Sequence, residues 1–187
     1  MQTQKVENLN SSGVKTMDSR DSIDVSSDAN QYLTFIMAGE EYGVDILCVQ
    51  EIRGWENATP LPNSPAHIKG VINLRGTIVP IIDLRQCFGL DCIEYTSITV
   101  VIVLKVNTGK GSRITGIVVD AVSDVYALEG SEMRAAPDMG SSINTDFIRG
   151  LVGVNEKMVI LLDIDKLLTR EDLSDLSEFS EHLGELN

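Results

Sequence analysis

Two segments of this chain align with each other without a gap. They are IKGVINLRGTIVPIIDL at residues 68–84 and IRGLVGVNEKMVILLDI at residues 148–164. Both keep an early glycine, a closing aspartate and nearly every apolar position. Conservation of that pattern within one chain is typical of two copies of the same strand-turn-strand unit. The sequence therefore predicts a duplicated fold.

An earlier pair of segments extends the repeat. Residues 43–52 (GVDILCVQEI) match residues 116–125 (GIVVDAVSDV) at an offset of 73, whereas the later pair is offset by 80. A seven-residue insertion in the second copy, within about residues 130–145, reconciles the two offsets. The chain is thus expected to contain two halves of similar size and plan.

Short β-branched runs separated by glycine-containing turns indicate an all-β fold. Residues 32–38 and 42–46 predict one hairpin, and residues 98–106 and 114–120 predict its counterpart in the second copy. Such spacing is typical of small antiparallel barrels or sandwiches. Pro80 lacks an amide donor, so its strand is expected at an edge or a bulge.

The ends of the chain differ in character from its middle. Residues 1–30 are polar and aperiodic, which predicts a disordered leader. Residues 169–187 form an acidic tail in which an apolar stripe of Leu176, Phe179, Leu183 and Leu186 predicts a short C-terminal helix. The start of the sequence does not have the pattern of a signal peptide, and no apolar run reaches 18 residues, so we expect a soluble, cytoplasmic protein.

Charge and residue usage exclude several functional classes. The formal net charge is −13, and no basic patch is evident, which argues against nucleic acid or direct membrane insertion. Three cysteines and two histidines do not have metal-ligand spacing, so we expect no metal site, no cofactor and largely buried thiols. A protein partner is the natural expectation.

Six residues at repeated or turn positions are interpreted as structural. Asp83 and Asp163 follow equivalent strands, and each is expected to cap the helical turn after it rather than act as a catalytic acid or base. The glycines are expected where the backbone turns tightly or approaches another strand. They are Gly70, Gly76, Gly116 and Gly150.

Arg75 has no counterpart in the second copy, which carries Asn155 and Glu156 at the matching turn. An arginine on a fixed turn can bind a carboxylate or backbone carbonyl groups of a partner. The alternative is an ordinary solvated charge, and the residues alone do not decide between the two. The mixed apolar and acidic strip at residues 49–52 could likewise dock a partner helix or form plain barrel surface.

The longest motifs resemble the CheW family of bacterial chemotaxis coupling proteins. They are GVDILCVQEIRG at residues 43–54, IKGVINLRGTIVPIIDLR at residues 68–85 and GIVVDAVSDV at residues 116–125. The resemblance covers residues 31–168 and implies two interleaved, SH3-like, five-stranded β-barrels, at about residues 31–95 and 96–164, with a hydrophobic core between them. It also implies a non-enzymatic adaptor that joins the cytoplasmic tips of chemoreceptors to the regulatory domain of the histidine kinase CheA.

The resemblance further implies which residues contact each partner. Val49, Glu51 and Arg75 would face the receptor, and Val125 would border the same groove. Asp138 and Met139 would contact the kinase, although family members often carry phenylalanine where this chain has Met139. The protein would be recruited to membrane-associated receptor arrays.

Two other hypotheses remain at this point. The groove between the barrels could bind a small apolar ligand and act as a sensor. An enzyme would have to use Asp83 and Asp163, since nothing in the sequence resembles a phosphate-binding loop or a nucleophile elbow.

Overall fold

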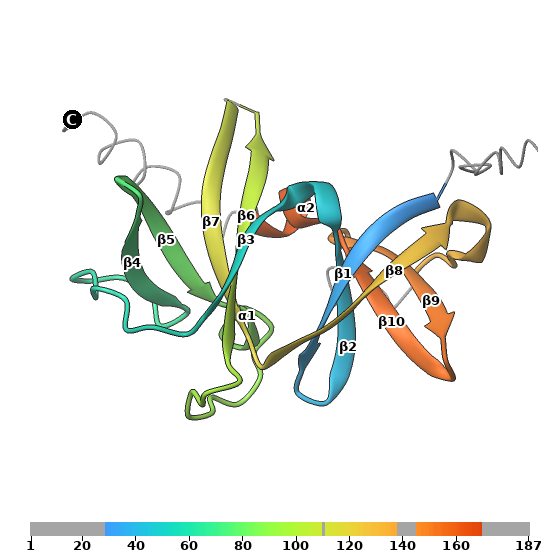
Figure 1. Cartoon of the computed structure of the whole chain (residues 1–187), viewed down its shortest axis with the longest axis horizontal. Helices are drawn as coiled ribbons and strands as arrows, with labels where there is room; N and C mark the ends of the chain where they lie inside the picture. Colours follow the sequence, from blue (N-terminus) through green and yellow to red (C-terminus); the bar gives the residue numbers. More distant parts are fainter. Residues whose placement is uncertain (1–28, 110, 138–144, 170–187) are drawn as a thin grey trace, which may run out of the picture.

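The computed structural model describes residues 29–109, 111–137 and 145–169, and shows ten strands with short helical turns between them (Figure 1). Most of the predicted leader and tail lies outside the described residues, as do Asp138 and Met139. The first strand already begins at Ala29, two residues before the predicted start of the folded domain at residue 31.

The described elements repeat in two sets. The first set comprises β1 (Ala29–Met37), β2 (Glu40–Asp45), the 3-10 turn η1 (Ile46–Cys48), β3 (Val49–Gly54), β4 (Ile68–Leu74), β5 (Thr77–Asp83) and α1 (Leu84–Cys87). The second comprises β6 (Val100–Thr108), β7 (Gly111–Val119), β8 (Ala121–Glu129), η2 (Gly130–Glu132), β9 (Ile148–Val154), β10 (Lys157–Leu162) and α2 (Ile164–Leu168). The strands β4 and β9 begin 80 residues apart, as do α1 and α2, which matches the offset of the sequence repeat.

The strands form two five-stranded sheets whose members are exchanged between the copies. One sheet has the order β8-β1-β2-β10-β9 and is called barrel 1; the other has the order β3-β6-β7-β5-β4 and is called barrel 2. Each barrel thus takes a hairpin from one copy and three strands from the other. The copies meet in two parallel pairs, β2 with β10 and β5 with β7, and in two antiparallel pairs, β1 with β8 and β3 with β6.

This exchange corrects the predicted ranges 31–95 and 96–164, which do not coincide with the two sheets. Both copies have the same alternation of apolar and polar residues, so either copy could supply a matching partner for each hairpin. The pattern identifies the strands, whereas their pairing depends on contacts between residues far apart in the chain.

Each sheet curls until its two edges approach each other. In barrel 2, Thr59 follows edge strand β3 and exchanges hydrogen bonds with Val71 of β4, at 2.8 and 2.9 Å. In barrel 1, Arg134 follows β8 and pairs in the same way with Leu151 of β9, at 2.9 and 2.8 Å. The predicted all-β barrel fold is therefore confirmed. In each barrel a single bridge joins the two edges of the sheet, and we call this junction the seam.

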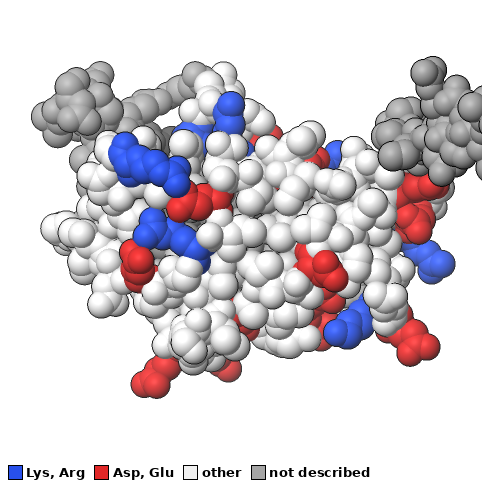
Figure 2. All heavy atoms as spheres, viewed as in Figure 1, with Lys and Arg blue, Asp and Glu red and all other residues white. Residues whose placement is uncertain are grey.

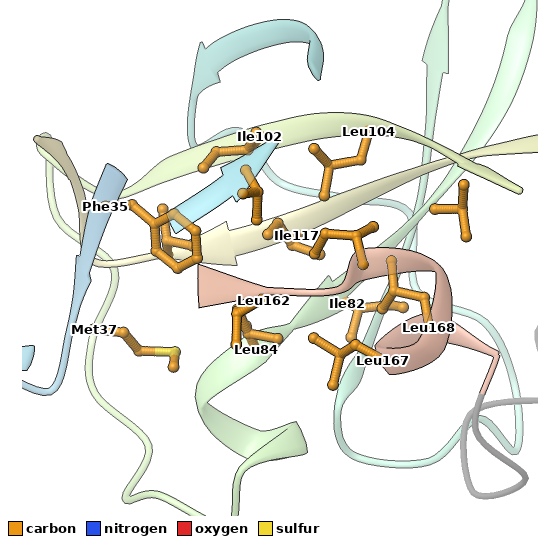
Figure 3. Close-up of a cluster of buried hydrophobic side chains, with 14 of the residues drawn as sticks. Phe35, Met37, Ile82, Leu84, Ile102, Leu104, Ile117, Leu162, Leu167 and Leu168 are labelled. Atoms are coloured by element: carbon orange, nitrogen blue, oxygen red, sulfur yellow. The ribbon is translucent and has the colours of Figure 1, made fainter. Parts of the chain in front are cut away.

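Apolar side chains form three clusters because alternate residues of a strand point to opposite faces. Small clusters fill the two barrels, around Tyr32 and Leu161 in barrel 1 and around Ile81 and Val103 in barrel 2. The large cluster lies between the barrels and includes side chains of both sheets and both α-helices, such as those labelled in Figure 3. The core between barrels that the family resemblance implies is present.

The strand that contains Pro80 is not an edge strand, contrary to the sequence-based expectation. β5 lies between β4 and β7. Its parallel pairing with β7 begins only at Ile81, so Pro80 precedes the stretch of β5 that pairs with β7. The strand is internal to the sheet, yet its proline sits where no ladder bond to β7 is lost.

Candidate functional site

The β4–β5 hairpin holds Arg75 in a rigid position. Arg75 and Gly76 are its two central residues, with φ of 50° and 90°, which is the conformation of a tight two-residue hairpin turn. The amide of Gly76 donates a hydrogen bond to the side-chain oxygen of Asn73 at 2.7 Å. The backbone at Arg75 is therefore fixed, while its side chain is 81% exposed.

Glu51 of β3 forms an ion pair with Arg75 at 3.1 Å between Oε2 and Nη2. The strands β3 and β4 are at opposite ends of the sheet order, so the contact exists only because barrel 2 curls. A guanidinium carries five N–H donors, and a single carboxylate leaves several of them available. The pair therefore presents an oriented, exposed cation at the seam of barrel 2.

Strand β3 and its counterpart β8 in the other barrel also carry apolar side chains. Val49 and Glu51 share the half-buried face of β3, and Val49 packs against the large core. Ile52 of β3 and Val125 of β8 occupy equivalent positions of the two copies, and each is 45% exposed. Thus Glu51 and Arg75 touch and Val49 lies on the same strand as Glu51, whereas Val125 belongs to the other barrel.

Ile52 belongs to the strip at residues 49–52 that the sequence already indicated as a possible docking surface, and it matches Val125 at the 73-residue offset. Sequence reasoning missed Leu47 of η1, which is 83% exposed and has no counterpart signal in the repeat. Figure 2 shows that the middle of the face crossed by β3 and β8 in Figure 1 carries few charged side chains. This face has the composition of a protein-docking surface, with apolar groups beside a few oriented charges.

Three of the glycines interpreted as structural lie where a side chain would collide with neighbours. A Cβ at Gly70 would overlap the carbonyl oxygen of Thr59 and lie 2.6 Å from its carbonyl carbon. At Gly116 the nearest atom would be Ile81 Cδ1 at 2.5 Å. At Gly150, the counterpart of Gly70, the closest approach is milder, 3.1 Å to the carbonyl oxygen of Arg134.

The two repeated aspartates cap the helices that follow them. Asp83 accepts hydrogen bonds from the amides of Arg85 and Gln86, at 2.9 and 3.3 Å, and Asp163 accepts one from the amide of Lys166 at 3.0 Å. Asp83 is buried and also accepts a 2.6 Å hydrogen bond from the hydroxyl of Tyr95. Burial, together with this hydrogen bond, raises the pKa of Tyr95 above its ordinary value.

Nothing in the described part of the chain assembles a metal centre. Within it, no group of three or more His, Cys, Asp or Glu side chains is arranged to hold an ion. Cys48 and Cys87 are half-buried and Cys92 is exposed, so the thiols are less buried than the sequence indicated. No helix among the described residues is long and apolar enough to span a bilayer.

Comparison with known proteins agrees with this architecture. Residues 31–172 match the model of the CheW-like domain family. The chain is 49% identical over 144 residues to chemotaxis protein CheW of Klebsiella aerogenes, covering 77% of this chain and 84% of that protein. It is 35% identical over 148 residues to chemotaxis protein CheW of Rhizobium meliloti, covering 79% and 93%.

A solved structure has the same fold. The scaffolding protein TtCheW from Thermoanaerobacter tengcongensis superimposes with a TM-score of 0.67 at 30% identity, covering 76% of this chain and 94% of that one. The family match spans well over half of the chain and both barrels. The chain therefore belongs to the CheW family, as a non-enzymatic scaffold that couples chemoreceptors to the histidine kinase CheA in chemotaxis.

Proposed function

We propose that this scaffold acts in the cytoplasm, at membrane-associated receptor arrays, and uses separate surfaces for its two partners. The cytoplasmic tip of a chemoreceptor binds the face that contains Val49, Glu51, Arg75 and Val125, which we call the receptor face. The regulatory domain of CheA binds at the segment that contains Asp138 and Met139.

The Glu51–Arg75 pair is the observation that carries the receptor assignment. An 81% exposed arginine on a fixed turn adds little to the stability of the fold, since an exposed ion pair contributes little to folding. The same guanidinium, already oriented by Glu51, can bind a carboxylate or the C-terminal carbonyl groups of a helix with little further loss of side-chain entropy.

The apolar part of the receptor face supports a helical partner. Ile52 and Val125, one from each barrel, expose matching aliphatic surface on either side of the junction between barrels. A helix laid along this junction would place apolar residues at helical spacing against both. The few charges in the middle of the face leave this apolar contact undisturbed (Figure 2).

The kinase assignment rests on family membership, because Asp138 and Met139 lie outside the described residues. In the chain, the segment that contains them lies between Arg134 and Leu151, whose bridge closes barrel 1, whereas the Glu51–Arg75 pair lies at the seam of barrel 2. The two contacts would therefore use different barrels.

Replacing Arg75 with alanine is expected to weaken binding of a receptor hairpin-tip fragment by about 10-fold, or about 1.4 kcal/mol. Glu51→Ala should act in the same direction, and the double variant should lose less than the sum, because the two residues act as one unit. Isothermal titration calorimetry measures all three.

Asn155→Ala is the matched control, because Asn155 occupies the same turn position of the β9–β10 hairpin in barrel 1, also at positive φ. It should leave receptor binding unchanged. Thermal unfolding of each variant must stay close to that of the original chain. Equal receptor affinity for Arg75→Ala and the unmodified protein would refute the receptor assignment.

Met139→Ala is expected to lower affinity for the isolated CheA regulatory domain by about 10-fold, since buried apolar anchors dominate interfaces of this kind. Its receptor-fragment affinity should not change. Calorimetry against both partners, with Arg75→Ala measured alongside, gives the reciprocal test. A Met139→Ala protein that binds the kinase domain normally would show that the kinase contact lies elsewhere.

A further inference from the structure

The two barrels are joined mainly by an apolar core, which resists separation better than it resists sliding. Burial of apolar surface is non-directional, so the large cluster of Figure 3 stabilises contact between the barrels without selecting one angle. Directional contacts must supply that selection. The structure has such contacts at both ends of the interface.

At one end, Asp120 connects three segments. Asp120 lies between β7 of barrel 2 and β8 of barrel 1, where the chain crosses from one barrel to the other. Its Oδ2 accepts hydrogen bonds from the amide of Ala38 at 2.8 Å and from Arg85 Nη1 at 2.6 Å. Its own amide donates to the carbonyl of Ile36 at 3.1 Å. We call Ala38, Arg85 and Asp120 the Asp120 latch.

The latch ties elements of different barrels. Ala38 is in the β1–β2 turn of barrel 1, in the left-handed conformation with φ of 53°. Arg85 is in α1, which follows β5 of barrel 2, and its Nε donates to the carbonyl of Asp91 at 3.0 Å. Because Arg85 is held at both Nε and Nη1, α1 is connected through Asp120 to the β1–β2 turn, and the two cannot shift independently without breaking a hydrogen bond.

A second, different contact lies at the other end of the interface, near α2 in Figure 1. Asp165 of α2 occupies the position equivalent to Arg85 and accepts hydrogen bonds from the backbone and side-chain amides of Asn107, at 2.7 and 3.1 Å. Arg113 of β7 also donates to the carbonyl of Leu168. Thus each α-helix contacts a hairpin of the other barrel, directly for α2 and through Asp120 for α1.

The Asp120 latch is the more constraining of the two, because it contains an ion pair that is largely shielded from solvent. The side chains of Arg85 and Asp120 are only 12% and 20% exposed. Charge-assisted hydrogen bonds are short and directional, and loss of one partner would leave the other charge poorly solvated. The Asn107–Asp165 hydrogen bonds are exposed.

We propose that Arg85 and Asp120 are positioning residues that set the angle between the barrels and so align the two halves of the receptor face. Val125 lies on β8, which starts directly after Asp120, while Val49 and Glu51 lie on β3 of barrel 2. A change of angle would move Val125 relative to the other two without altering either barrel. The proposal rests on the receptor assignment above for its functional consequence.

The test measures inter-barrel orientation and receptor binding on the same full-length variants. Residual dipolar couplings of backbone amides in β1, β2 and β8–β10 define the alignment of barrel 1, and those in β3–β7 define that of barrel 2. The angle between the two alignment frames is compared for the unmodified chain, Arg85→Ala, Asp120→Ala and the milder Arg85→Gln, which covers the case in which an alanine variant does not fold. Calorimetry with the receptor-tip fragment follows.

Arg149→Ala is the matched control. Arg149 of β9 also pairs with an aspartate, Asp45, at 3.4 Å, but both residues belong to barrel 1 and the arginine is 43% exposed. Removal of this pair should change neither the angle nor the affinity. Any effect common to Arg149→Ala and Arg85→Ala would be a general consequence of losing an arginine.

For the latch variants we expect dipolar couplings that still fit each barrel separately, but a changed or broadened angle between the barrels. Receptor affinity should fall by about 3- to 10-fold, because fewer molecules have the two halves of the receptor face aligned for binding. An unchanged angle would overturn the proposal, whatever happens to affinity. If the unmodified chain fails to bind the receptor fragment, the receptor assignment falls, and the couplings still decide whether the latch sets the angle.

Discussion

Replacement of Phe35 with alanine should lower the free energy of unfolding by about 3–5 kcal/mol, because the ring is fully buried in the large core between the barrels. The ring also stacks on Tyr42, with centroids 6.0 Å apart. Loss of the ring leaves a cavity that faces side chains of both barrels, and neither barrel can relax into it without disturbing the other.

The substitution in barrel 1 should be detected by a probe in barrel 2. Phe35 lies on β1 of barrel 1, whereas Trp55, the single tryptophan of the chain, directly follows β3 of barrel 2 and contacts Tyr95 with a centroid distance of 4.3 Å. Because strands are exchanged between copies, the barrels should unfold together. Urea denaturation followed by Trp55 fluorescence and by far-UV circular dichroism should show one coincident, shifted transition.

Met158→Ala provides the control for Phe35→Ala, since Met158 is also in barrel 1 but is 52% exposed. Its transition should move by less than about 0.5 kcal/mol. A Phe35→Ala protein in which the Trp55 transition keeps its midpoint while circular dichroism shifts would mean that the barrels unfold independently. The strand exchange would then contribute no cooperativity.

Gly70→Ala should destabilise the protein by about 3 kcal/mol or more, although it adds a single methyl group. Gly70 has φ of 125°, a conformation that residues with a Cβ rarely adopt, and the added carbon would overlap the backbone of Thr59. Thr59 also forms the bridge to Val71 that closes barrel 2. Relief of the overlap therefore requires that bridge to open.

Two glycines of β9, the counterpart of β4, serve as comparisons for this prediction. Gly150→Ala, at the counterpart position in barrel 1, should cost about 1 kcal/mol, since its contacts begin at 3.1 Å and its φ is not in the left-handed region. Gly153→Ala, where no atom lies within 4 Å, should be close to neutral. Chemical denaturation of the three variants gives the ranking, and a Gly70→Ala protein as stable as Gly153→Ala would contradict it.

Local features of this fold were predictable from the sequence. The hairpins at residues 32–46 and 98–120 follow from β-branched runs around turns, and the caps at Asp83 and Asp163 follow from an aspartate placed directly before a helical turn. The repeat itself followed from a comparison of the chain with itself. The hairpins and the caps depend on residues only a few positions apart, and the conformational preferences of such residues do not depend on the rest of the chain.

Contacts of the candidate site were only partly predictable. Glu51 and Arg75 were each candidates, but nothing in their spacing indicates that they meet, because their strands are at opposite ends of a sheet. Likewise, Arg85 and Asp120 are 35 residues apart and each could pair with many other charges. Long-range pairs of this kind exist only after the sheets curl and pack.

The sequence by itself determined that this protein is a duplicated all-β chain with specified strands, turns and caps, and it carried the family motifs. The tertiary structure alone decided which copy completes which barrel, where Pro80 is tolerated and which charges face one another. Both copies have the same apolar pattern, so local preference cannot choose between them. That choice is made by the exchanged pairing and by the core that the two barrels share.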